Sequence, residues 1–281
     1  MGTDSDGPTG ATLSYRKILE REMESALKEM DRPVLGTFIS GFSAGLNLSF
    51  GALFMAMVLT FSGGFGSELT KQVVLAGVSS IPFLFVVIGQ TELFTAHSTM
   101  AVLPVFDGRA SISDLGRIWS VTYVSNLVGC GAFVALIVAI GDPMGIAEPA
   151  AFGSLAGALV GLPWWVIVLS GVIAGWLMGL ATWLSAASRD TIGRIIFVLL
   201  TTAAIGFGPF HHAILGTTEV LSAVALGTGV TLEAFGLFLL CTTIGNIIGG
   251  TVFVGLINYG HIALAGEQKD VEFEAKEMDD S

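Results

Sequence analysis

Long apolar stretches without charge alternate with short charged segments along most of the chain. Four stretches contain no Asp, Glu, Lys or Arg, namely residues 36–61, 118–140, 163–187 and 234–265. Two further apolar stretches, 73–106 and 195–231, contain one carboxylate each, Glu92 and Glu219. Each stretch is long enough to cross about 30 Å of hydrocarbon at about 1.5 Å per helical residue. The pattern therefore predicts an all-α integral membrane protein with six transmembrane helices.

The composition agrees with this class and excludes several others. Of the 281 residues, 53% are hydrophobic and 12% are charged, with a mean hydropathy of +0.79, whereas a soluble domain carries about twice that share of charge. The formal net charge of −11 comes mostly from the C-terminal tail, where residues 267–280 hold seven acidic residues against two lysines. An acidic chain without a basic surface is not expected to bind nucleic acid.

The basic residues predict the orientation in the membrane. They lie before the first span, after the last, and in the loops between spans two and three and between spans four and five: Arg16, Lys17, Arg21, Lys28, Arg32, Arg109, Arg117, Arg189, Arg194, Lys269 and Lys276. Only Lys71 falls on the opposite side. Cytoplasmic loops of membrane proteins are enriched in Lys and Arg, so this 11-to-1 split places both termini in the cytoplasm and the chain in the cytoplasmic (inner) membrane.

Three regions follow from the same pattern. Residues 1–34 form an N-terminal tail with a cytoplasmic amphipathic helix over about residues 13–31, ended by Pro33. Residues 35–262 form the membrane domain, and residues 263–281 form an acidic, solvated tail. The apolar positions of the amphipathic helix recur at helical spacing, as Ile18, Leu19, Met23, Ala26, Leu27 and Met30.

The two halves of the membrane domain resemble each other. Residues 126–137 align with 246–257, with Asn, Gly, Phe, Val, Leu and Ile in register, and residues 40–45 align with 170–175. Because three spans separate the copies, the second half must be inverted in the membrane. Inverted repeats are typical of transport proteins, whose substrate path lies near the repeat interface.

The second and fifth spans are both interrupted, at residues 89–95 and 206–212. Aligning Gly89 with Gly206 places Thr95 opposite His212. Glycine and Pro209 weaken these helices, and unpaired backbone at membrane depth persists only where protein or a water-filled path surrounds it. The polar residues gather at these breaks, which predicts a pore there. Glu92 is expected to accept hydrogen bonds from loop amides, and Glu219 to stabilise the broken helix.

Three motifs carry a resemblance to a known family. Residues 92–95 (ELFT), 210–213 (FHHA) and 243–250 (TIGNIIGG) occur on spans two, five and six. In this order they resemble the formate/nitrite transporter family over about residues 36–260. The resemblance implies an aquaporin-like homopentamer in which each protomer has its own pore. It also implies transport of a small monovalent anion such as formate, nitrite, acetate or hydrosulfide, often with a proton.

The resemblance also implies roles for individual residues. His212 matches the family's central pore histidine, Thr95 the threonine that hydrogen-bonds near it, and Asn246 the asparagine of span six. His211 stands where the family usually has glutamate, and either couples to His212 or faces a neighbouring subunit. Gly175 stands where the family usually has a second asparagine, on span four. Residues 150–165 lack the lysine expected in the outer vestibule.

Two constrictions complete the implied pore. Leu93 and Phe94 match its cytoplasmic side, and Phe83 and Ile205 fall at the outer counterpart. A bare anion crosses apolar walls only at a large desolvation cost, and histidine titrates near physiological pH. The histidine either pairs with the anion as imidazolium or donates a proton so that the neutral acid crosses, and we favour proton donation because the walls disfavour net charge.

Other functions are weighed against this one. A channel for a small neutral solute such as ammonia is the principal alternative, because such channels also place histidines in an apolar pore. The G-x-S-x-G pattern of residues 41–45 belongs to hydrolases only at a strand–turn–helix elbow, and here it lies inside a predicted helix. Cys130 and Cys241 are expected to be packing residues. We therefore predict no enzymatic activity, no cofactor and no metal site.

Overall fold

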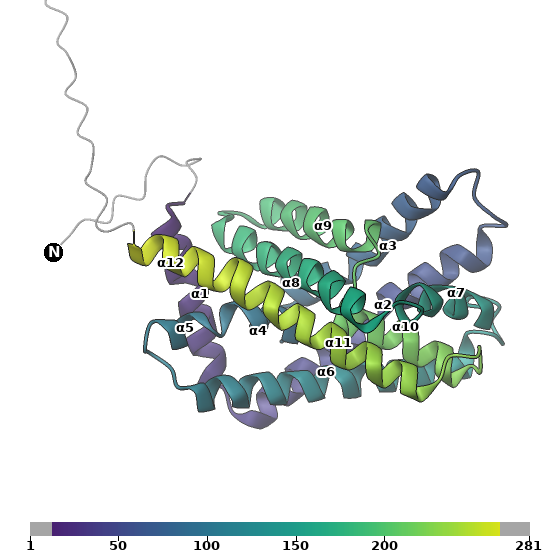
Figure 1. Cartoon of the computed structure of the whole chain (residues 1–281), viewed down its shortest axis with the longest axis horizontal. Coiled ribbons are helices and arrows are strands. Elements are labelled where there is room, and N and C mark those ends of the chain that lie inside the picture. The colour runs from purple at the N-terminus through teal and green to yellow at the C-terminus, as the bar shows by residue number, and fades with distance from the viewer. Residues whose placement is uncertain (1–12, 265–281) are drawn as a thin grey trace, which may run out of the picture.

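All regular structure in the computed structural model is helical within residues 13–264, the part of the chain that it describes. The predicted acidic tail lies almost wholly outside that range. In chain order the helices are α1 (Tyr15–Met30), α2 (Val34–Phe61), α3 (Glu68–Ile88), α4 (Phe94–Met100), α5 (Leu103–Phe106), α6 (Ile112–Ile140), α7 (Pro149–Val160), α8 (Trp164–Ala187), α9 (Thr191–Phe207), α10 (Ala213–Ala225), α11 (Leu232–Ile248), the π-helical η1 (Gly249–Leu256) and α12 (Ile257–Leu264) (Figure 1).

Five helices of the described chain are long and apolar enough to cross a membrane, which are α2, α3, α6, α8 and the continuous helix Leu232–Ala263. The sixth predicted span is divided between the shorter helices α9 and α10. The two predicted interruptions are confirmed, because α3 ends at Ile88 before α4 begins at Phe94, and α9 ends at Phe207 before α10 begins at Ala213.

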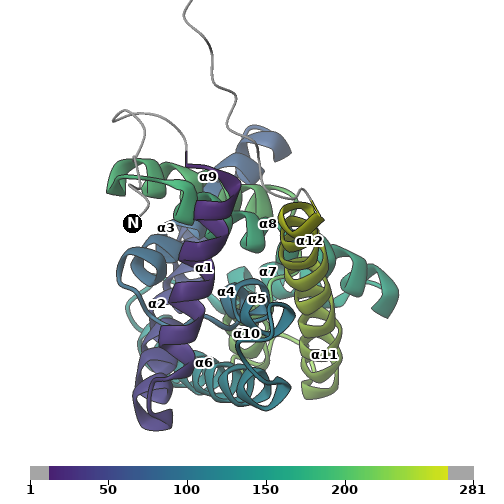
Figure 2. The ribbon, with the colours of Figure 1, turned by 90° about the vertical axis from the view of Figure 1, so that its left-hand side faces the viewer.

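The two halves pair their helices in the same way. α2 packs along α6 in the first half, α8 packs along α11 in the second, and α3 meets α9 between the halves. α1 and α12 lie at the same end of the bundle (Figures 1 and 2), where the rings of Tyr15 and His261 are 5.2 Å apart. The described chain therefore begins and ends on one side of the bundle.

α7 was not predicted from the sequence and has a counterpart in the first half. Pro33 is the residue before α2 and follows α1, and Pro163 is the residue before α8 and follows α7. The two prolines and their helices thus occupy equivalent places 130 positions apart in the chain. α7 is apolar whereas α1 is amphipathic, and the difference in composition conceals the relationship in the sequence.

Glycines allow the paired helices to approach closely. A Cβ atom added at Gly45 would lie 2.2 Å from the backbone oxygen of Asn126, and one added at Gly175 would lie 2.3 Å from that of Asn246. Both distances are far below van der Waals contact. The glycine at 175 thus brings α8 against α11 at the asparagine, as small residues do in membrane helix pairs.

Replacing Gly175 by alanine is expected to destabilise the protein by about 1–3 kcal/mol, because the new methyl group has only backbone to displace. Thermal unfolding of the purified protein in detergent measures the effect. The matched control is Gly236→Ala on α11, where a Cβ atom meets nothing within 4 Å and alanine favours the helix. Equal melting temperatures for the two variants would contradict the close approach of α8 and α11.

α1 is the predicted amphipathic helix, and its apolar face is docked on the bundle. Ser14 caps its first turn by accepting a hydrogen bond from the Lys17 N–H, and Arg21 donates to the carbonyls of Ala186 and Ser188 at the end of α8. Burial, with the nearby charge of Glu29 adding to it, raises the pKa of Glu22 to about 8. The Glu22 carboxyl group is therefore protonated at neutral pH.

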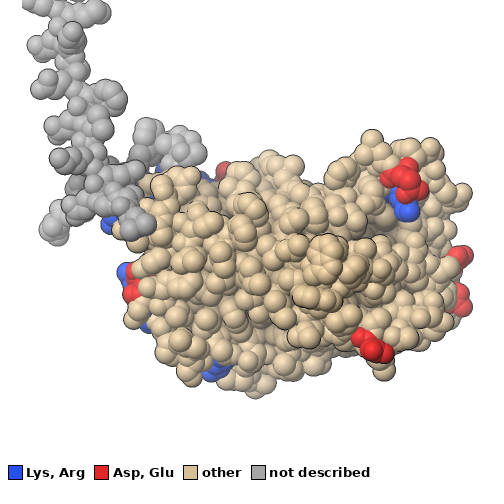
Figure 3. All heavy atoms as spheres, viewed as in Figure 1, with Lys and Arg blue, Asp and Glu red and all other residues tan. Residues whose placement is uncertain are grey.

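The face of the bundle seen in Figure 3 is almost uncharged, with its Lys, Arg, Asp and Glu gathered towards the two ends. Large apolar side chains are exposed on the membrane helices, for example Leu200 at 64% and Leu169 at 58%. A surface of this kind is suited to lipid or to neighbouring subunits and not to water. The membrane assignment from the sequence therefore agrees with the surface of the fold.

Candidate functional site

The two helix breaks meet inside the bundle at a pair of polar side chains. Thr95, in the first turn of α4, lies with its Oγ1 2.9 Å from Nε2 of His212, the residue before α10. Both side chains are buried, with 0% and 2% exposed. The predicted association of Thr95 with His212 is therefore present.

The hydrogen bonds of His212 define its tautomer. The Leu215 N–H donates to Nδ1 at 3.2 Å, which caps the first turn of α10. Nδ1 must be unprotonated to accept this bond, so in the neutral ring Nε2 carries the hydrogen and donates it to Thr95. The Thr95 hydroxyl keeps its own hydrogen for another acceptor. Protonating Nδ1 would break the cap, so the resting histidine is neutral.

A cavity of about 140 Å³ leads from the end of the bundle remote from α1 and α12 to His212. Its walls come from α2, α3, α7, α9 and α10 and are mostly apolar. Its polar lining side chains are Lys71, Gln72, Ser79, Ser154, His212 and Glu219. Lys71 thus gives the cavity a basic residue, although residues 150–165 contain none.

Two asparagine side chains form hydrogen bonds with the buried backbone groups at the breaks. Asn246 on α11 accepts from the Ala213 N–H at 2.9 Å and donates to the carbonyls of Gly171 and His211. Asn126 on α6 does the same in the other half, accepting from the Phe94 N–H and donating to Gly41 and Glu92. Helix ends buried without partners are costly, and these side chains satisfy them.

These equivalent bonds correct the predicted register of the repeat. Because Phe94 corresponds to Ala213, Leu93 is the counterpart of His212, and the alignment that placed Thr95 opposite His212 was wrong by two residues. The same bonds agree with the predicted pairing of Asn246 with Asn126 on α6. The glycine at 175 allows close packing of α8 against α11.

The predicted constriction residues are all buried near the breaks. Phe83 places its ring edge-on to His212, with centroids 5.2 Å apart, and Ile205 lines the cavity beside it. Leu93 is the residue before α4, and Phe94 packs against Tyr123 of α6 at 4.7 Å between centroids. Leu93 and Phe94 are thus buried at the first break and lie outside the lining of the cavity.

His211 is turned away from the cavity. Its Nδ1 lies 2.7 Å from the Ser170 hydroxyl, and its Nε2 donates to the Leu159 carbonyl at 2.9 Å. The ring therefore ties the second break to α7 and α8, and it is 1% exposed. Both predicted alternatives for His211, coupling to His212 and facing a neighbouring subunit, are replaced by this contact within one chain.

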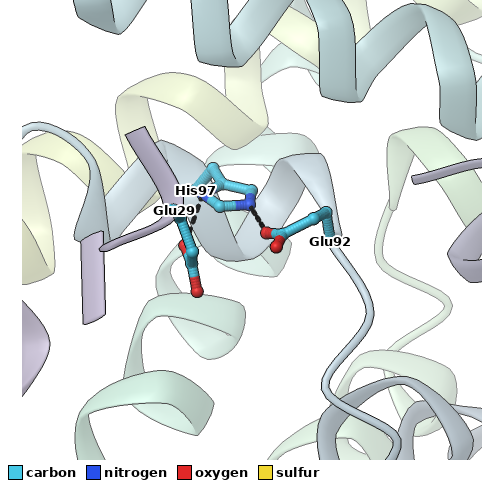
Figure 4. A group of neighbouring side chains, drawn as sticks. All are labelled: Glu29, Glu92 and His97. Carbon is cyan, nitrogen blue, oxygen red and sulfur yellow. Dashed lines mark hydrogen bonds and ion pairs between the residues drawn. The ribbon is translucent and has the colours of Figure 1, made fainter. Parts of the chain in front are cut away.

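Glu92 makes the corresponding contact in the first half, and its predicted loop-amide bonds are replaced by charged ones. Glu92 forms an ion pair with Arg32 and lies 2.5 Å from His97 Nε2, while His97 Nδ1 lies 3.2 Å from Glu29 (Figure 4). This network ties the first break to α1. The pair of Arg32 and Glu92 spans 60 residues of sequence, so no local pattern indicated it.

The trio Glu29, Glu92 and His97 is the group within the described residues whose spacing would suit a metal ion. The Arg32 guanidinium already compensates the Glu92 carboxylate. A divalent cation would have to displace that guanidinium and would lie beside its positive charge. The arrangement fits an ion-pair network better than a metal centre.

Three features define a membrane channel or transport protein: broken helices that meet at buried polar residues, a cavity leading to them, and helices long and apolar enough to cross a membrane. The hydrolase alternative fails on geometry, because residues 41–45 lie within α2 and Ser43 bonds only to Asn47. A family model described as formate/nitrite transporter matches residues 16–260. The chain belongs to the formate/nitrite transporter family, whose members are transporters and channels and not enzymes.

Individual relatives and solved structures agree with the family. The chain is 33% identical over 280 residues to a probable formate transporter of Methanothermobacter thermautotrophicus, covering 92% of this chain and 97% of that protein. Its fold is similar to that of an FNT family ion channel, with a TM-score of 0.75 at 24% identity over 88% of this chain and 97% of the other. A pentameric formate channel with formate bound gives a TM-score of 0.70 at 23% identity, covering 82% and 98%. The predicted fold class is thereby confirmed.

Proposed function

We propose that the chain moves a small monovalent weak-acid anion across the membrane together with a proton. Family membership gives the class of transport, and the relative's printed name, a probable formate transporter, supports formate as substrate. Nitrite, acetate and hydrosulfide share its size and single charge. The observation that carries the proposal is the Thr95–His212 hydrogen bond at the bottom of a mostly apolar cavity.

The chemistry of that hydrogen bond supports the proposed proton linkage. An anion at the breaks accepts a hydrogen bond from Thr95, whose oxygen accepts from His212. His212 becomes charged only by giving up its bond from Leu215, so imidazolium is favoured only while an anion is beside it. Solvent in the cavity supplies the added proton. The imidazolium then passes its Nε2 proton to the Thr95 oxygen while the Thr95 hydroxyl gives its own proton to the anion, so the neutral acid leaves and the ring is neutral again. The neutral acid crosses the apolar barriers at far lower cost than the ion.

The barriers and the assembly complete the proposal. Leu93 and Phe94 form the constriction on the side of the termini, and Phe83 and Ile205 form the one on the cavity side. The skewed distribution of basic residues and the shared end of α1 and α12 support cytoplasmic termini in the inner membrane. Similarity to a pentameric channel, together with the exposed apolar side chains of the membrane helices, supports a homopentamer embedded in lipid.

Flux through proteoliposomes tests the substrate class. We expect uptake of formate, nitrite, acetate or hydrosulfide that rises as the pH is lowered from 7 to 6 and 5, above the leak of protein-free liposomes. The neutral-solute alternative predicts instead that ammonia moves and that none of the anions does. That second outcome would overturn the proposal.

A further inference from the structure

Glu219 places a carboxyl group inside the cavity that leads to His212. It is 7% exposed and belongs to the cavity lining. Glu219 lies seven positions after His212, the N-cap of α10, which is about two helical turns. The two residues therefore lie on the same face of the helix, about 10 Å apart along its axis. A solute that moves through the cavity from Lys71 to His212 therefore passes this carboxyl group.

The Glu219 carboxyl group has no hydrogen-bond or charge partner among the described residues. The other titratable side chains of the cavity are Lys71 on α3 and His212 itself. Lys71 lies 3.3 Å from Glu68 at the rim. The cavity-facing residues of α2 and α7 are uncharged, and α4, α6 and α11, which pack against other sides of α10, contribute none. An ionised carboxylate held there without a partner is unfavourable.

The fold itself does not require this carboxyl group. In the register set by the two asparagines, the counterpart of Glu219 in the first half is Met100. Met100 is the last residue of α4, the helix that follows the first break, and the start of α4 is held by the same kind of asparagine bond. The sequence predicted that Glu219 stabilises the broken helix. The first half shows that a half-helix of this kind is held without a carboxyl group at this position.

We propose that Glu219 is a binding residue at which one proton is shared between its carboxyl group and the carboxylate of a short monocarboxylic acid. The inference rests on the proposed function and specifies its substrate class. Two carboxylates in contact cannot both be ionised, whereas one proton between them forms a strong hydrogen bond. The cavity therefore admits a monocarboxylate only together with a proton.

The Glu219→Gln variant tests this role, because its amide donates a hydrogen bond at every pH. The measurement is the apparent KM for formate at the cavity side of right-side-out membrane vesicles, at pH 7 and pH 9. Because an ionised carboxylate is unfavourable at this site, the wild-type KM should rise about tenfold between these two pH values, as Glu219 loses the proton that it shares. In E219Q the KM should change by less than about twofold, giving tighter binding than the wild type at pH 9.

Matched variants make the result specific. Glu148→Gln removes one exposed carboxylate just before α7 and should keep the wild-type pH dependence of KM. Glu219→Asp keeps a titrating group and should also keep it. If E219Q does not assemble, Glu219→Ser removes the titration in its place and should flatten the KM in the same way.

The outcomes separate this inference from the proposed function. A KM in E219Q that rises with pH as in the wild type would overturn the role of Glu219 while leaving transport in place. A complete loss of formate flux in an assembled E219Q would also overturn it, because the amide should still bind the anion. A wild type that moves no anion would overturn the proposed function and, with it, this inference.

Discussion

Replacing His212 with alanine is expected to lower proton-linked formate flux by at least about a hundredfold, the scale on which a single proton-transfer group acts. Alanine removes the hydrogen-bond partner of Thr95 and the imidazole that lines the cavity where the two breaks meet. The Leu215 N–H loses its acceptor as well, which costs about 1 kcal/mol of helix capping and leaves most of the stability intact. Flux with an internal pH dye and size-exclusion chromatography measure both effects.

The neighbouring histidine provides the control. His211→Gln keeps a side chain able to hydrogen-bond with Ser170 and the Leu159 carbonyl. We expect this variant to be less stable than the wild type but to keep pH-dependent flux. Retained pH-dependent transport in H212A, or its loss in a well-assembled H211Q, would show that the proton-transfer group has been assigned to the wrong histidine.

Replacing Asn246 with alanine should cause the largest loss of stability of any single substitution considered for this chain. The side chain is 0% exposed and makes three hydrogen bonds of 2.8–2.9 Å to backbone groups of Gly171, His211 and Ala213. Each buried backbone group left without a partner costs about 1–3 kcal/mol, so the total should reach about 3 kcal/mol or more. Thermal unfolding of the purified protein in detergent measures it.

Alanine variants of two other asparagines provide comparisons for this loss of stability. Asn126→Ala removes the equivalent bonds of the first half and should destabilise the protein by a similar amount. Asn47→Ala removes a single 3.5 Å contact with Ser43 within α2 and should change the melting temperature little. If the Asn246 variant melts like the Asn47 variant, the asparagine is not what holds the second break.

The features that were predictable from the sequence are those encoded locally. Uncharged apolar length indicated the membrane helices, and glycine with Pro209 indicated where α9 must end. Spacing of apolar residues indicated α1, with Pro33 at its end. Shared residues at 126–137 and 246–257 indicated the inverted repeat. Each of these depends on a few neighbouring residues, so one sequence suffices.

The missed features depend on contacts between distant residues. Gly89 directly follows α3, whereas Gly206 still lies inside α9, so aligning the two glycines shifted the breaks by two residues. Glu92 pairs with Arg32, which lies between α1 and α2, and the partners of His211 come from α7 and α8. These partners are distant in the sequence, so no pattern near Glu92 or His211 indicates them. Only the three-dimensional arrangement shows that one break is tied by charge and the other by neutral hydrogen bonds.

The same limit applies to the cavity. The motif around His212 drew attention to the break, but nothing in it indicates that Lys71, about 140 positions earlier, lines the same cavity. Glu219 was visible as a lone carboxylate in an apolar segment, and helical spacing alone relates it to His212. Its lack of a partner becomes apparent only when the walls contributed by α2, α3, α7 and α9 are in place.

The most direct test of the central claim is a simultaneous count of formate and protons entering proteoliposomes, with the membrane potential set by potassium and valinomycin. The proposed mechanism predicts about one proton for each formate and a rate that does not follow the imposed potential, because the neutral acid crosses the barriers. Formate entry that follows the potential without acidifying the interior would contradict it, and would mean that the anion crosses past His212 with its charge.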